Sequence, residues 1–129
     1  MNLETQKITV QKSAKETFKF LTDLNNFEGL IPESKEKFEV DGDSFIFGLK
    51  GMPEIRLVLQ EQVEYSKIVL GAASSKLPFT LTLDINELDD NSSENQLFFK
   101  GDFNPMMAMM IKGPLQKFIN TLSENMAKL

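Results

Sequence analysis

The sequence predicts an α+β domain in which an antiparallel sheet of about seven strands curves around one long C-terminal helix, with two short helices after the first strand. Between residues 38 and 103, apolar and polar residues alternate, as they do in half-buried strands. From Met107 to Leu129 the apolar spacing changes to three and four residues, which is typical of an amphipathic helix. A chain of 129 residues has the usual size of one domain, so residues 1–129 are expected to form a single unit.

The N-terminal segment predicts a strand followed by two short helices. Apolar and polar residues alternate from Leu3 to Gln11, which indicates a half-buried strand. Ser13 and Glu16 have the spacing of a capping box, in which two side chains bond backbone donors at a helix start, so a helix is expected over residues 14–23. A second helical turn, ended by Pro32, is indicated by apolar residues three apart: Leu24, Phe27 and Leu30.

Six further strands are predicted along the middle of the chain. Asp41-Gly42 is a strong signal for a tight hairpin between the first two of them. The other connections are also short, so consecutive strands should pair antiparallel; they include Gly51-Met52-Pro53, residues 64–67, Lys76-Leu77-Pro78 and residues 89–95. The apolar residues that mark the six strands are Phe38 and Val40; Phe45, Phe47 and Leu49; Ile55, Leu57, Leu59 and Val63; Ile68 and Leu70; Phe79, Leu81, Leu83 and Ile85; Leu97, Phe99 and Phe103.

The long C-terminal helix has two unusual features. Gly113-Pro114 interrupts it, which predicts a kink or, alternatively, two helices with Pro114 as the first residue of the second. Near its start the side chains of Met106, Met107, Met109, Met110 and Ile111 surround the helix instead of forming a stripe. A loop covers the outer methionines, or they border the opening of a cavity, or they form an exposed patch for a partner or a membrane surface.

Composition excludes several classes of function. The 19 acidic residues outnumber 14 basic ones, for a net charge of -5, and scattered lysines argue against nucleic acid as a partner. With no Cys and no His, thiolate and imidazole metal sites and Ser-His-Asp catalysis are absent, and no cofactor is expected. The polar start predicts a cytoplasmic protein, and no apolar run approaches the roughly 20 residues of a transmembrane helix. Peripheral membrane or protein contact through residues 106–111 stays open.

The chain resembles a known superfamily in one stretch and in the order of its elements. Residues 8–23, followed by Phe27, Leu30 and Pro32, resemble the first strand and helical pair of bacterial members of the START-like (SRPBCC) superfamily. This is the helix-grip fold shared by the birch-pollen allergen and polyketide cyclase families. The resemblance covers the whole chain and implies an elongated cavity between sheet and helix. It transfers no functional residue, because these families place carriers, cyclases and chaperone partners on one scaffold.

These observations favour binding or transport of a hydrophobic small molecule, such as a lipid, isoprenoid or polyketide-like compound, over an enzyme. One alternative is a cyclase- or dehydratase-like enzyme, and another is a protein-interaction module that resembles the chaperone-activating members and uses the methionines. The expected ligand-binding residues are the large apolar side chains on the inward parity of the strands and on the first turns of the long helix: Phe45, Phe47, Leu57, Leu59, Phe79, Leu81, Leu83, Phe99, Phe103, Met107, Met110, Ile111 and Leu115.

Two charged residues are candidate polar anchors for a ligand. Glu61 shares the parity of Leu57 and Leu59, which would point it inward and make it the best available acid or base. The alternative, which the usual exposure of carboxylates favours, is that the strand has left the core by then. Arg56, the one arginine, could clamp an anionic group, but its parity predicts a solvated surface position unless the register changes before it.

Overall fold

A computed structural model describes residues 1–32, 35–49, 54–73 and 78–129. The predicted connections Gly51-Met52-Pro53 and Lys76-Leu77 lie outside these residues. The elements are β1 Asn2–Glu4, β2 Ile8–Val10, α1 Ala14–Thr22, the 3-10 helix η1 Leu24–Gly29, β3 Lys37–Asp41, β4 Ser44–Gly48, β5 Ile55–Val63, β6 Lys67–Ala72, β7 Phe79–Asp89, β8 Ser92–Gly101 and α2 Pro105–Met126.

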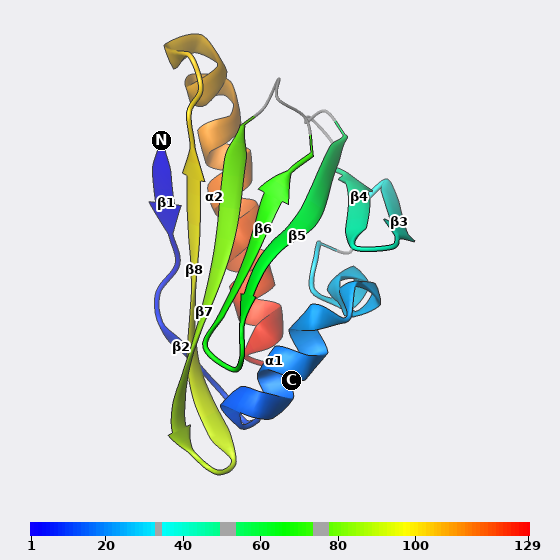
Figure 1. Cartoon of the computed structure of the whole chain (residues 1–129). Helices are drawn as coiled ribbons and strands as arrows, with labels where there is room; N and C mark the ends of the chain where they lie inside the picture. The colour runs from blue at the N-terminus through cyan, green and yellow to red at the C-terminus, as the bar shows by residue number, and fades with distance from the viewer. Residues whose placement is uncertain (33–34, 50–53, 74–77) are drawn as a thin grey trace.

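The strands form one antiparallel sheet in the order β1-β8-β7-β6-β5-β4-β3, and β2 also pairs with β8 (Figure 1). The predicted α+β architecture is therefore confirmed, with two short helices near the N-terminus and one long helix at the C-terminus. Among the described residues, no helix combines the length and the apolar run needed to cross a bilayer.

The predicted N-terminal strand is in fact two short strands separated by an irregular step at Thr5. β1 pairs Glu4 with Phe98, whereas β2 pairs Ile8 with Asn95, so the register shifts by one residue between them. At the step, the hydroxyl of buried Thr5 accepts a hydrogen bond from the backbone N–H of Leu97 at 3.1 Å. A side chain thus replaces the backbone acceptor that a continuous strand would supply.

The start of α1 follows the predicted cap. The Ser13 hydroxyl accepts a hydrogen bond from the Glu16 N–H at 3.1 Å and donates to the Glu16 carboxylate at 3.4 Å. This satisfies one of the backbone donors that every helix leaves open at its N-terminus. The helix ends at Thr22, and Asp23 then caps η1 by accepting from the Asn25 N–H.

The β3–β4 hairpin turns one residue later than the sequence signal suggests. Asp41 pairs with Ser44, so the two loop residues are Gly42 and Asp43. Gly42 has φ +62, which a residue without a Cβ adopts at little cost at the first position of such a turn.

A bulge at Gln60 reverses the facing of the second half of β5. Leu59 pairs with Leu70, but Glu61 pairs with Val69, which leaves Gln60 as an extra residue. The Gln60 amide lies against Gly71 of β6, where an added Cβ would stand only 2.0 Å from its nitrogen. The absent side chain of Gly71 therefore makes room for the bulge, and Glu61 turns to the outer face.

The inner face of the sheet is covered by α1, η1 and α2, which lie on one side of it (Figure 1). Along α2 the buried residues recur at helical spacing, namely Ile111, Leu115, Phe118, Ile119, Leu122, Ser123 and Met126. Two side-chain amides fasten this helix: Gln116 donates to the Glu4 carbonyl at 3.2 Å, and Asn125 donates to the Leu30 carbonyl at 2.8 Å.

α2 is one continuous helix with Pro114 inside it, so the alternative of two separate helices is wrong. Because Pro114 has no N–H, the carbonyl of Met110 loses its usual partner within the helix. The first turns of α2 extend beyond the ends of the neighbouring strands (Figure 1).

The cap predicts a measurable stability change. Ser13→Ala should lower the free energy of unfolding by about 1 kcal/mol, because it leaves the Glu16 N–H without its acceptor. Urea unfolding followed by far-UV circular dichroism measures the change, with Ser13→Asp as the control that keeps an acceptor. Equal stability of Ser13→Ala and wild type would show that the cap contributes nothing.

Candidate functional site

The expected ligand-binding residues of the strands share the inner face of the sheet. The row Leu59, Leu70, Leu81 and Phe99 crosses four adjacent strands in register. All of these except Leu59 are buried, and so are Phe45, Phe47, Leu57 and Leu83 from the predicted set. Parity along the strands thus identified one continuous apolar surface that faces the helices.

Aromatic stacking joins this surface to the helices at the β4 side. The rings of Phe47 and Phe118 stack with centroids 4.8 Å apart, which places α2 directly over β4. Phe45 stacks on Phe27 of η1 at 5.1 Å. These contacts pack α2 and η1 tightly against β4.

A second aromatic group, the aromatic cluster of Phe79, Phe99 and Phe103, lies where β7 begins and β8 ends. Phe79 and Phe99 stack at 4.9 Å, and Phe99 and Phe103 at 6.2 Å. A Cβ on Gly101 would stand 2.4 Å from the Phe103 ring, so this glycine lets the ring lie against the backbone of β8. The cluster therefore requires a residue without a side chain at position 101.

Several apolar side chains at this end of the inner face are only partly buried. Phe79 and Phe103 of the aromatic cluster are only half-buried, and so is Met107 in the first turn of α2. Phe79 also borders a broad depression of about 830 Å³, whose lining includes Asn2, Thr80 and Lys100 of the outer face of the sheet. Half-exposed rings therefore stand at the edge of the buried apolar row.

The start of α2 divides its apolar residues between two faces. Met107, Ile111 and Leu115 point toward the sheet, as expected for the ligand-binding set. Met110 is 68% exposed and lies nearly opposite Leu115 around the helix, so its expected inward position is wrong. With Met106 at 75% and Met109 at 84% exposure, it forms an outward-facing surface that we name the methionine face.

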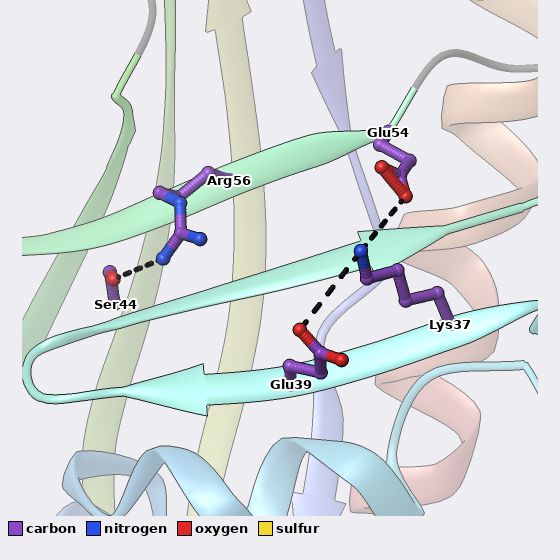
Figure 2. A network of polar contacts seen from close by, with 5 residues as sticks. All are labelled: Lys37, Glu39, Ser44, Glu54 and Arg56. Atoms are coloured by element: carbon purple, nitrogen blue, oxygen red, sulfur yellow. Dashed lines mark hydrogen bonds and ion pairs between the residues drawn. The ribbon is translucent and has the colours of Figure 1, made fainter.

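Neither candidate polar anchor points into the interior. Glu61 is on the outer face because of the Gln60 bulge, and its carboxylate lies 3.9 Å from Lys67 Nζ. Arg56 also lies on the outer face, as its parity predicted, and donates to the Ser44 hydroxyl at 2.8 Å (Figure 2). Beside it, Lys37 bridges Glu39 and Glu54 across β3–β5, at 4.0 and 3.4 Å.

The described part of the interior contains no titratable side chain. Its buried polar residues carry hydroxyl or amide groups only: Thr5, Ser13, Thr17, Ser44, Ser92, Ser93, Asn95 and Ser123. Within the same residues, no three His, Cys, Asp or Glu side chains gather in a metal-binding arrangement. General acid–base chemistry needs a titratable group within reach of a substrate, and none lies inside the described sheet–helix layer.

Shifted pKa values among the described residues occur on turns. The backbone N–H of Asn91 donates to Asp89 at 2.8 Å and holds the pKa of that carboxyl below its usual value. The negative charge of Glu64 raises the pKa of Tyr65, in the β5–β6 turn. Asp89 lies at the end of β7, whereas Tyr65 packs edge-on against Phe18 of α1, with ring centroids 5.6 Å apart.

The inner face of β8 also carries a polar group that was not among the predicted site residues. Ser93 and Asn95 share the facing of Leu97 and are 0% and 1% exposed. The sequence signal that could have identified this group is two polar residues at positions where the alternation along β8 predicts buried apolar ones.

Comparison with known proteins shows the fold. No family model matches the chain, and no curated protein matches its sequence. Norcoclaurine synthase from Thalictrum flavum, in complex with dopamine and hydroxybenzaldehyde, superposes with a TM-score of 0.74 at 12% identity, covering 99% of this chain and 86% of that one. XoxI from Bacillus cereus gives 0.70 at 9% identity (98% and 94% covered), and a conserved protein from Geobacillus kaustophilus gives 0.67 at 12% (99% and 93%). The predicted START-like, helix-grip architecture is confirmed at the level of the fold.

The two faces of α2 predict opposite responses to a charge. Met110→Lys should leave the melting temperature within error of wild type, because its side chain is already in water. Ile111→Lys should lower the free energy of unfolding by at least 3 kcal/mol, roughly the cost of an unpaired charge in place of a buried side chain. Differential scanning calorimetry of the pair measures both effects. Equal losses in the two variants would mean that the methionine face is covered.

Proposed function

We propose that this chain, which has the helix-grip fold, binds a hydrophobic small molecule between the inner face of β7–β8 and α2. The observation that carries the proposal is the group of partly buried apolar side chains at one end of the inner face. There the half-buried residues Phe79, Phe103 and Met107 lead to a buried apolar row. Binding sites for small molecules are typically concave and apolar with few polar groups, which matches this surface.

The chemistry of the interior supports an uncharged ligand. An ion transferred into an apolar layer without a partner loses its hydration at a high cost in free energy. The described interior offers hydroxyl and amide groups but no charge to compensate it. Lipids, isoprenoids and polyketide-like compounds without a buried charged group satisfy this condition.

A structural neighbour also supports the proposal. The norcoclaurine synthase structure holds dopamine and hydroxybenzaldehyde on the same fold at 12% identity. Small aromatic molecules can therefore be accommodated by this architecture. Binding without catalysis is favoured here because Glu61, the best candidate acid or base, is solvated on the outer face.

Leu81→Trp tests the proposal at the centre of the apolar row, where Leu81 is 1% exposed. Beside a ligand space, the larger ring should be tolerated in the ligand-free protein and should sharply weaken uptake of the apolar fluorophore N-phenyl-1-naphthylamine. In a filled core, the added volume should cost about 1 to 3 kcal/mol. Thr82→Trp, on the outer face of the same strand, is the matched control.

Both parts of the result are required. Near-wild-type melting of Leu81→Trp together with weak uptake supports ligand binding, provided that Thr82→Trp takes up the fluorophore normally. If Leu81→Trp melts well below wild type and wild type takes up no fluorophore, the interior is a solid core.

A second candidate function, docking to another protein, is favoured by the methionine face. Met side chains adapt to irregular surfaces, and three of them are solvated on adjacent turns of α2. Lys112 and Lys117 are the charged residues of α2 near this face, and no acidic residue occurs between Phe103 and Ser123. The complementary partner is a protein with an apolar groove bordered by carboxylates.

Met109→Lys tests docking, because it places a charge in the middle of the methionine face. A purified partner should bind this variant at least tenfold more weakly, while fluorophore uptake stays unchanged. Leu88→Lys is the control, since Leu88 is also exposed, at 50%, but lies in β7 near the β7–β8 turn. Equal affinity of the partner for Met109→Lys and wild type would exclude this surface.

A further inference from the structure

One buried polar atom has no partner in the described part of the protein. Asn95 of β8 is 1% exposed, and its side-chain oxygen Oδ1 accepts no hydrogen bond. Buried acceptors are nearly always paired, because an unpaired one loses its bonds to water without replacement. Such an atom inside an apolar layer therefore indicates a missing partner.

A chain of hydrogen bonds connects the nitrogen of the amide to α1 and leaves the oxygen free. Asn95 Nδ2 donates to Ser93 Oγ at 3.1 Å, and Ser93 Oγ lies 3.1 Å from Thr17 Oγ1. In the arrangement that also bonds the Lys12 carbonyl, which lies 3.5 Å from Thr17 Oγ1, Ser93 donates to Thr17. Ser93 then has only lone pairs to offer Asn95, which accordingly presents its N–H₂ group to Ser93. The free atom is the oxygen.

The surroundings of Asn95 restrict the partner to a neutral donor. Its strand neighbours are Ile8 on one side and Ile85 on the other, and Leu97 follows on the same face. All buried polar side chains of the described residues carry hydroxyl or amide groups, so no buried charge lies beside it. A cationic donor would lack a counter-charge here, whereas a hydroxyl or an amide N–H needs none.

We propose that Asn95 Oδ1 is the interior polar anchor of the binding site and accepts a hydrogen bond from a hydroxyl at one end of the ligand. This inference rests on the proposed function and specifies its ligand class, an elongated apolar alcohol. Phe99 of the aromatic cluster lies four residues along β8, which corresponds to about 13 Å. An alcohol of that length places its hydroxyl at Asn95 and its tail among the half-exposed rings.

Competition for bound N-phenyl-1-naphthylamine tests this anchor with decanol and decyl methyl ether. The two compounds have similar apolar chains, but the ether has no proton to donate. Wild type should bind decanol about fivefold more tightly, the typical effect of one neutral hydrogen bond. Asn95→Leu, of similar shape, should lose this preference while it binds the ether as well as wild type does. Asn86→Leu, an exposed position on β7, should keep the preference.

The outcomes separate this inference from the proposed function. Uptake of the fluorophore with equal affinities for decanol and the ether in wild type would overturn the anchor and leave apolar binding in place. That outcome, with a water bonded to Oδ1 in a crystal structure, assigns the atom to an internal water only. No uptake of any of the three compounds would overturn both. The wild-type comparison decides the question even if Asn95→Leu fails to fold.

Discussion

Mutual burial of the sheet's inner face and the apolar stripe of α2 is the interaction on which the rest of the structure depends. The strands from β4 to β8 bury large apolar side chains on the inner face, and those side chains need a cover. α2 supplies it along Leu115 to Met126, where the Phe47–Phe118 stack and the Gln116 and Asn125 amides fix its position. Its first turns extend past the ends of the neighbouring strands.

This arrangement gives the interior two chemically different ends along β8. At one end, the aromatic cluster and Met107 are half-exposed and present adaptable apolar surface. At the other, beneath α1, the chain Thr17–Ser93–Asn95 ends in an unpaired oxygen. The proposed ligand, an elongated apolar alcohol, matches this gradient, because its hydroxyl would lie at the polar end and its tail at the apolar end.

Much of the fold could be predicted from the sequence, because alternation along strands and helical spacing in α2 report directly on burial. Features that depend on contacts between distant segments could not. The bulge at Gln60 requires Gly71 on the neighbouring strand, and the break at Thr5 requires the N–H of Leu97. Helical spacing left the environment of Met110 open, because the sequence does not show how far the sheet extends along α2. Asn95 faces inward on β8 but is polar, so the alternation of apolar residues does not identify it.

The most direct measurement is mass spectrometry of a solvent extract from protein purified under native conditions, combined with a crystal structure of the same sample. The account predicts an uncharged, elongated apolar molecule in near-stoichiometric amount, with density between β7–β8 and α2 and a donor group at Asn95 Oδ1. An empty extract, together with an interior completely filled by side chains, would contradict it.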